Sequence, residues 1–223
     1  MKNYQLEVLT YINANELLSQ LFAYYMQYCT SACLPYHNLN HTFKMMWHII
    51  QISKDPEYDI SNEDLLVMLS AAIFHDYNHS GGIFSDLMNV NIAVGSFAEA
   101  CNDIFGHDSN YDLYISQVEN CIYATEYPYS TNQIGLLEQI VRECDVLSQL
   151  HEDVFTHTIY GLKQEMHIHS WTECIKKYTD FLQNMCYNEL SLNYSKQYIN
   201  DNIENILLII NTVTTLYTNG TRI

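Results

Sequence analysis

Apolar residues recur at a spacing of three to four along most of this chain. Between residues 39 and 53, for example, Phe43, Met46, Trp47 and Ile50 lie on one side of a helical projection. Only 7 Gly and 3 Pro occur among the 223 residues, so few positions interrupt such helices. We therefore expect an all-α protein rather than a barrel or a sandwich, folded as one compact multi-helix domain over residues 1–223.

Cap and break residues divide the chain into separate expected helices. Ser61 and Asp64 form a capping-box pattern, and Gly106 is suited to end a helix. Thr131 is suited to begin one, after the break at Tyr127-Pro128. The expected ranges are 5–29, 39–53, 62–76, 86–105, 111–125, 131–150, 151–166, 170–190 and 194–217.

The composition limits the partners of the protein. A net charge of −17, from 26 acidic and 9 basic residues, argues against binding to duplex nucleic acid or to a membrane surface. Seven scattered cysteines without a CxxC pair favour reduced thiols. There is no signal-peptide pattern and no apolar run of the ~20 residues that span a bilayer. We expect a cytoplasmic protein.

Two histidines at helical spacing are the first candidates for a functional site. His37 and His41, in PYHNLNHTF, can face one pocket if their helix begins at or before residue 37. Pro35 favours that start, because proline suits the first turn of a helix. Ordinary histidines at the surface or the edge of the core are the alternative.

A His-Asp doublet, His75-Asp76 in AAIFHDYNHSGG, is the second candidate. Neighbouring helical residues point about 100° apart, so both can reach one metal only near a helix end, which Gly81-Gly82 suggests. The doublet follows an apolar stretch, where a carboxylate needs a partner or a metal ion. A C-terminal histidine with a solvated aspartate is the alternative.

Asp145, in RECDVL, is the third candidate. It lies on or beside the apolar stripe that contains Val141, Cys144 and Leu147. A carboxylate in that position needs a partner, which is either a divalent cation or Arg142.

Taken in order, YHNLNH, FHDYNHSGG and RECDVL resemble the H…HD…D pattern of the HD-domain metal-dependent phosphohydrolase superfamily. The motifs are most similar to those of class I cyclic-nucleotide phosphodiesterase cores, and short HD proteins of bacteria and phages look similar too. The resemblance covers about residues 34–150 and implies an HD-domain bundle with a metal site between its helices.

The resemblance implies two divalent metal ions (Zn, Mn, Mg or Fe), with Asp76 bridging them. The implied metal ligands are His41, His75, Asp76 and Asp145. His37 would be the general acid, and His79 would form a hydrogen bond near the second metal. Tyr36 would line the pocket, and Gln183 would bind the base.

The expected activity is hydrolysis of the phosphodiester bond of a cyclic mono- or dinucleotide. A nucleotidase or phosphomonoesterase, and a non-catalytic nucleotide- or partner-binding module, remain as alternatives. A di-iron oxygenase ranks lower, because the interval between the doublet and Asp145 contains only His79 and His107 as further histidines. The apolar faces of residues 5–29 and of the last helix leave a homo-oligomer open.

Overall fold

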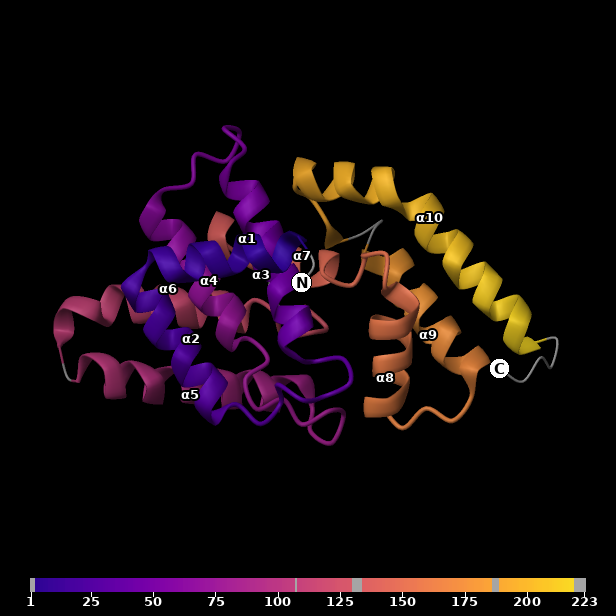
Figure 1. Ribbon diagram of the computed structural model, residues 1–223, viewed down its shortest axis with the longest axis horizontal. Coiled ribbons are helices and arrows are strands. Elements are labelled where there is room, and N and C mark those ends of the chain that lie inside the picture. Colours follow the sequence, from indigo (N-terminus) through magenta and orange to yellow (C-terminus); the bar gives the residue numbers. More distant parts are fainter. Residues whose placement is uncertain (1–2, 107, 130–133, 186–188, 219–223) are drawn as a thin grey trace.

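The described part of the computed structural model, residues 3–106, 108–129, 134–185 and 189–218, is built from helices and contains no β-strand. This confirms the all-α prediction (Figure 1). None of the described helices is long and apolar enough to cross a lipid bilayer.

The helices follow one another along the chain with short joints. In chain order they are α1 (Asn3–Ala14), α2 (Glu16–Tyr28), α3 (Leu39–Ser53), α4 (Asn62–Phe74), α5 (Asp86–Phe105), a 3-10 turn (Ser109–Tyr111), α6 (Asp112–Tyr123), α7 (Leu136–Leu147), a π-helical segment η2 (Val154–Ile159), α8 (Tyr160–Glu165), α9 (Trp171–Asn184) and α10 (Asn193–Thr218).

Local side chains explain where several helices begin. Ser61 and Asp64 form the expected capping box of α4, and the side chain of Ser85 accepts a hydrogen bond from the backbone of Met88 at the start of α5. The expected start at Thr131 lies outside the described residues.

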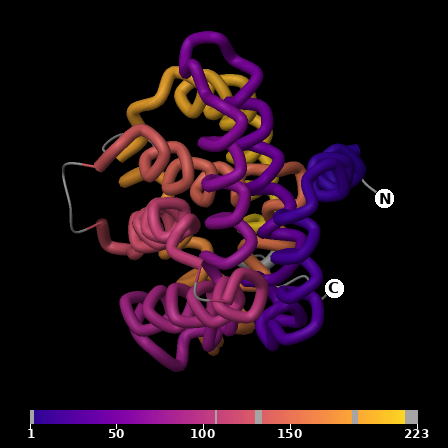
Figure 2. The backbone as a smooth tube through the Cα atoms, turned by 90° about the vertical axis from the view of Figure 1, so that its left-hand side faces the viewer, coloured from indigo at the N-terminus to yellow at the C-terminus, as the bar shows by residue number. Residues whose placement is uncertain are grey.

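The expected helix over residues 5–29 is wrong, because it is two helices. Asn15 leaves the helical conformation, and its side-chain oxygen accepts a hydrogen bond from the backbone N–H of Leu18. Asparagine is favoured as an N-cap over a helix interior, since its side chain competes for backbone groups. In Figure 2 the two N-terminal helices lie along one edge of the molecule.

Buried residues form two apolar clusters. The larger one joins α1 to α7 around residues such as Met46, Ile50 and Phe74. The smaller one joins the end of α7 to α9 and α10, with Tyr178 and Leu182 among its members. Figure 1 shows α8, α9 and α10 together on one side of the molecule. α7 therefore contributes to both clusters, and Asp145 lies near its C-terminal end.

Candidate metal centre

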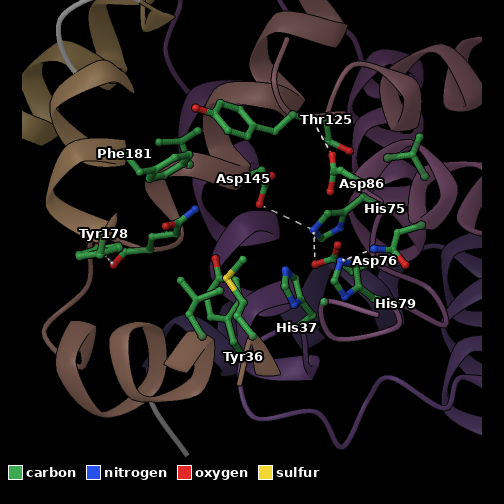
Figure 3. A pocket seen from close by; sticks show the side chains of 18 of the residues that line it. Tyr36, His37, His75, Asp76, His79, Asp86, Thr125, Asp145, Tyr178 and Phe181 are labelled. Carbon is green, nitrogen blue, oxygen red and sulfur yellow. Dashed lines mark hydrogen bonds and ion pairs between the residues drawn. The ribbon is translucent and has the colours of Figure 1, made fainter. Parts of the chain in front are cut away.

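Three helices bring the four expected ligands together. His41 lies in the first turn of α3, His75 caps the C-terminus of α4, and Asp76 follows it. Asp145 lies in the last turn of α7. Figure 3 shows His75, Asp76 and Asp145 pointing toward one another from their separate elements.

α3 covers the expected range 39–53, and its start determines how His37 and His41 are placed. α3 begins at Leu39, because the side-chain oxygen of Asn38 accepts hydrogen bonds from the backbone N–H groups of Asn40 (2.9 Å) and His41 (3.4 Å). The earlier start that Pro35 favours is therefore not the one observed, and His37 and His41 do not share a helix. His37 precedes the helix, yet its ring centroid lies 6.2 Å from that of His41.

The end of α4 explains how adjacent residues share a site. The helix ends at Phe74 rather than at residue 76, and the chain then turns. Asn78 and Gly81 have positive φ angles of 56° and 66°, so the backbone leaves the helical path. This turn lets the His75 and Asp76 side chains converge.

The ligand atoms lie at the separations that a small cation imposes. His41 Nε2 lies 3.0 Å from His75 Nε2, 3.0 Å from Asp145 Oδ1 and 3.2 Å from Asp76 Oδ2. His75 Nε2 lies 2.9 Å from Asp76 Oδ2 and 3.8 Å from Asp145 Oδ1. Ligands about 2.0–2.2 Å from a metal lie about 3.0–3.6 Å from each other. The two-nitrogen, two-oxygen set therefore fits a divalent ion.

Hydrogen bonds on the far side of each imidazole orient both rings. Ser148 Oγ donates to the Asp145 carbonyl (2.6 Å), so it accepts the Nδ1–H of His41 (2.8 Å). The Nδ1–H of His75 donates to the Ala72 carbonyl (2.9 Å). Each ring therefore directs Nε2 at the centre, as outer partners of metal-binding histidines commonly do.

Positive charge is required among these atoms. Burial lowers the pKa of His41, but hydrogen bonds to Asp145 and Asp76 outweigh it and raise the pKa to about 9. Burial raises the pKa of Asp76, yet the neighbouring His75 and His37 hold it well below its usual value. Oδ2 of Asp76 is buried, and its close neighbours are the Nε2 atoms of His75 (2.9 Å) and His41 (3.2 Å). A shared proton or a metal ion can satisfy this arrangement.

Asp145 does not use the alternative partner considered from sequence. Arg142 Nε instead donates to the Ala124 carbonyl (2.8 Å), and its guanidinium lies 4.1 Å from the centroid of the Tyr129 ring. Asp145 therefore faces the histidines.

A second group could hold another ion beside the first. The nitrogen and oxygen atoms of His37, Asp76 and His79 lie within 4.8 Å of one another. Asp76 thus adjoins both groups, which is consistent with a bridging role. The rings of His37 and His79 stack with their centroids 3.7 Å apart.

Hydrogen-bond donors face both ring nitrogens of His79. The backbone N–H of Gly81 donates to Nδ1 (3.1 Å), and Asn89 Nδ2 lies 3.0 Å from Nε2. Burial and the nearby His37 lower the pKa of His79 to about 4. A doubly protonated imidazolium, which only donates, is disfavoured there.

Glu165 is a site residue that the sequence did not reveal. Its Oε2 lies 2.5 Å from His37 Nδ1, and its Oε1 accepts the backbone N–H groups of Tyr36 and of His37 (3.0 Å). Burial raises the pKa of Glu165, but the contact with His37 outweighs it and leaves the pKa below its usual value. The one hint in the sequence is Gly161, four residues before Glu165. The structure shows why a glycine is there: a Cβ would lie 2.8 Å from the Pro35 carbonyl oxygen.

A cavity of about 380 Å³ opens beside the histidines and aspartates. It combines these residues with aromatic and apolar side chains, and Figure 3 shows Tyr178 and Phe181 on the far side from His75. Asp86 and Thr125 also line it, and Tyr36 lies in its wall as expected.

The expected base-binding Gln183 does not line this cavity. It lies on the exposed face of α9, because Tyr178 and Phe181 occupy the inward face at that helical phase. Gln149 lines the cavity instead, and its buried Oε1 has no hydrogen-bond partner in the described part of the chain.

Comparison of the chain with protein-family models, curated proteins and solved structures yields no match. The fold and the site themselves define a class: an all-helical protein with two His/Asp groups that could hold metal ions.

Proposed function

We propose that this chain is a metal-dependent phosphohydrolase of the HD type, which hydrolyses the phosphodiester bond of a cyclic mono- or dinucleotide. The observation that carries the proposal is the convergence of His41, His75, Asp76 and Asp145 at one edge of an aromatic cavity. Divalent ions bound there would polarise the phosphate and activate water.

His37 is suited to the proton-transfer role. Glu165 occupies its Nδ1, so Nε2 is the nitrogen left for a ligand in the cavity that His37 lines. The carboxylate contacts Nδ1 and orients the ring, so that a proton carried on Nε2 can pass to the leaving oxygen. His37 therefore acts as the general acid, and Glu165 orients it.

The cavity also supports a substrate larger than inorganic phosphate. Tyr129, Tyr178 and Phe181 provide aromatic surface suited to a flat ring. The unpartnered Oε1 of Gln149 calls for an N–H or O–H donor from the ligand, since a buried acceptor without a partner is unfavourable. A nucleobase supplies both features.

The test is hydrolysis by the metal-loaded protein of cAMP, cGMP, cyclic dinucleotides and nucleoside monophosphates. Product from a cyclic substrate supports the proposal. Product from monophosphates alone identifies the nucleotidase alternative, and binding without turnover of any substrate identifies a nucleotide-binding module.

Variants separate metal binding from proton transfer. Asp145→Ala and His75→Ala should lose the metal held by the His41, His75 and Asp145 group in elemental analysis, whereas His37→Ala should keep that metal and lose rate. An unchanged metal content in the first two variants would refute the ligand assignment.

A further inference from the structure

A buried hydrogen-bond chain outside the ligand set runs from the middle of α3 to its N-cap. The side chain of Lys44 is fully buried, and its Nζ lies 2.6 Å from Asp153 Oδ1 and 3.3 Å from His157 Nδ1. On the other side of the ring, His157 Nε2 lies 3.1 Å from Asn38 Oδ1. The chain thus joins α3 to the π-helical segment η2 (Val154–Ile159).

The donor directions along this chain are determined by chemistry. A lysine ammonium only donates, so Nδ1 of His157 accepts and the ring proton lies on Nε2. That Nε2–H then donates to Asn38 Oδ1. The orientation of the Asn38 amide agrees, because its Nδ2 donates to the carbonyls of Leu34 (2.7 Å) and Pro35 (3.1 Å).

Asn38 connects this chain to the candidate metal centre. Its Oδ1 accepts the backbone N–H of His41, and its own position follows His37 directly. The segment that carries both histidines is therefore held by η2 through His157 and by the end of α8 through Glu165. π-helical segments occur frequently at functional sites, and here the segment carries His157.

A buried lysine is expensive to retain, since its charge must be compensated by Asp153. The ion pair of Lys44 and Asp153 therefore has a role besides packing, because Lys44 fixes the tautomer of His157.

We propose that His157, with its tautomer set by Lys44, is a positioning residue for His37 and His41. This positioning role deepens the proposed phosphohydrolase function. Its effect on kcat rests on that function, whereas its effect on metal binding can be measured without any substrate. His157 is not among the residues that line the cavity, although its ring centroid lies 5.7 Å from that of Tyr36; it acts through Asn38.

The main test compares His157→Leu with His157→Gln in the Co²⁺-loaded protein. Leucine removes both hydrogen bonds, whereas the glutamine amide can accept from Lys44 and donate to Asn38. We expect His157→Leu to bind Co²⁺ with an altered visible absorption spectrum and to lose about 10- to 100-fold in metal affinity or kcat. His157→Gln should restore most of both. His169→Leu, at an exposed histidine, is the matched control.

Two outcomes overturn the proposal. One is a folded His157→Leu protein with the spectrum, affinity and kcat of the parent; the other is equal impairment of the Leu and Gln variants. The spectrum and affinity remain informative if no substrate is hydrolysed, so failure of the proposed function is distinguishable.

A measurement on the unaltered protein covers the case in which His157→Leu does not fold. Histidine-selective ¹⁵N NMR should show His157 with a proton on Nε2 and none on Nδ1, with its signals assigned by their absence from His157→Gln. A proton on Nδ1 would overturn the proposal.

Discussion

At the scale of single residues, Glu165 concentrates three contacts on the segment before α3. One oxygen accepts two backbone N–H groups, and the other pairs with the His37 ring. A carboxylate in this position fixes the orientation of the ring.

Replacing Glu165 with Gln should slow turnover without releasing metal. The amide replaces the carboxylate that orients the His37 ring, so we expect kcat to fall by about 10²-fold, within the range typical of general acid catalysis. Metal content should equal that of the parent by elemental analysis. Glu173→Gln, on the exposed surface of α9, is the control. A parental kcat would contradict the role of Glu165.

Gln149 and Gln183 form a natural pair for comparing substrate binding. Gln149→Ala removes a buried acceptor from the cavity, so KM should rise by about three- to tenfold, which corresponds to one hydrogen bond of about 0.5–1.5 kcal/mol. Gln183→Ala, on the exposed face of α9, should leave KM unchanged. The reverse result in steady-state kinetics would restore the assignment made from sequence.

The sequence could indicate some site residues because their signals are local. His75-Asp76 follows an apolar stretch, and Asp145 lies beside an apolar stripe, so burial of charge was foreseeable. Glu165 and His157 reach the site only through packing between segments more than a hundred residues apart. Nothing in the spacing of a short amphipathic segment encodes such a contact.

At the scale of elements, the approach of α8 to the segment before α3 depends on Gly161. A Cβ on this residue would lie 2.8 Å from the Pro35 carbonyl oxygen and 2.9 Å from Tyr36 Cβ. Glu165, one turn further along the same helix, would move away from His37 with any displacement of α8.

Gly161→Ala should therefore destabilise the protein by about 1–3 kcal/mol through overpacking. Gly95→Ala is the opposite case, because a Cβ there meets nothing within 4 Å on the exposed face of α5. It should stabilise the protein by about 0.5–1 kcal/mol, since alanine is the better helix former. Urea unfolding measures both, and equal changes in the two variants would contradict the close contact.

Helix boundaries were predictable where one side chain decides them. Ser61 and Asp64 cap α4 as the sequence suggested, because both partners lie within four residues. Asn15 and Asn38 are also local caps; α3 begins where its expected range begins, whereas the apolar periodicity of residues 5–29 continues past Asn15, and Pro35 favoured a start before Asn38. Whether a helix continues or ends at such a residue depends on tertiary contacts that the sequence does not display.

At the scale of the whole molecule, the candidate ligands tie together α3, α4 and α7. The all-α architecture was predictable from periodicity, whereas the division into two apolar clusters was not, since both consist of similar helices.

A metal that binds only the folded protein stabilises it by mass action. At a free metal concentration of 100 times Kd, the free energy of unfolding should rise by about 2.7 kcal/mol. Calorimetry with and without Mn²⁺ or Zn²⁺ should show a higher Tm for the parent and no shift for Asp145→Ala. A shift of the same size in this variant would place the ion elsewhere.

Because Asp76 and Asp145 lie close to His41, protons compete with the metal ion for its ring nitrogen. Because the pKa of His41 is raised to about 9, this imidazole is protonated at neutral pH in the absence of metal, and ligation requires that proton to leave. Apparent affinity should thus weaken about tenfold for each pH unit below 9, for one displaced proton. Calorimetric titrations in buffers of different ionisation enthalpy would count the protons released, and an acidifying compartment would strip the protein of its metal without any chelator.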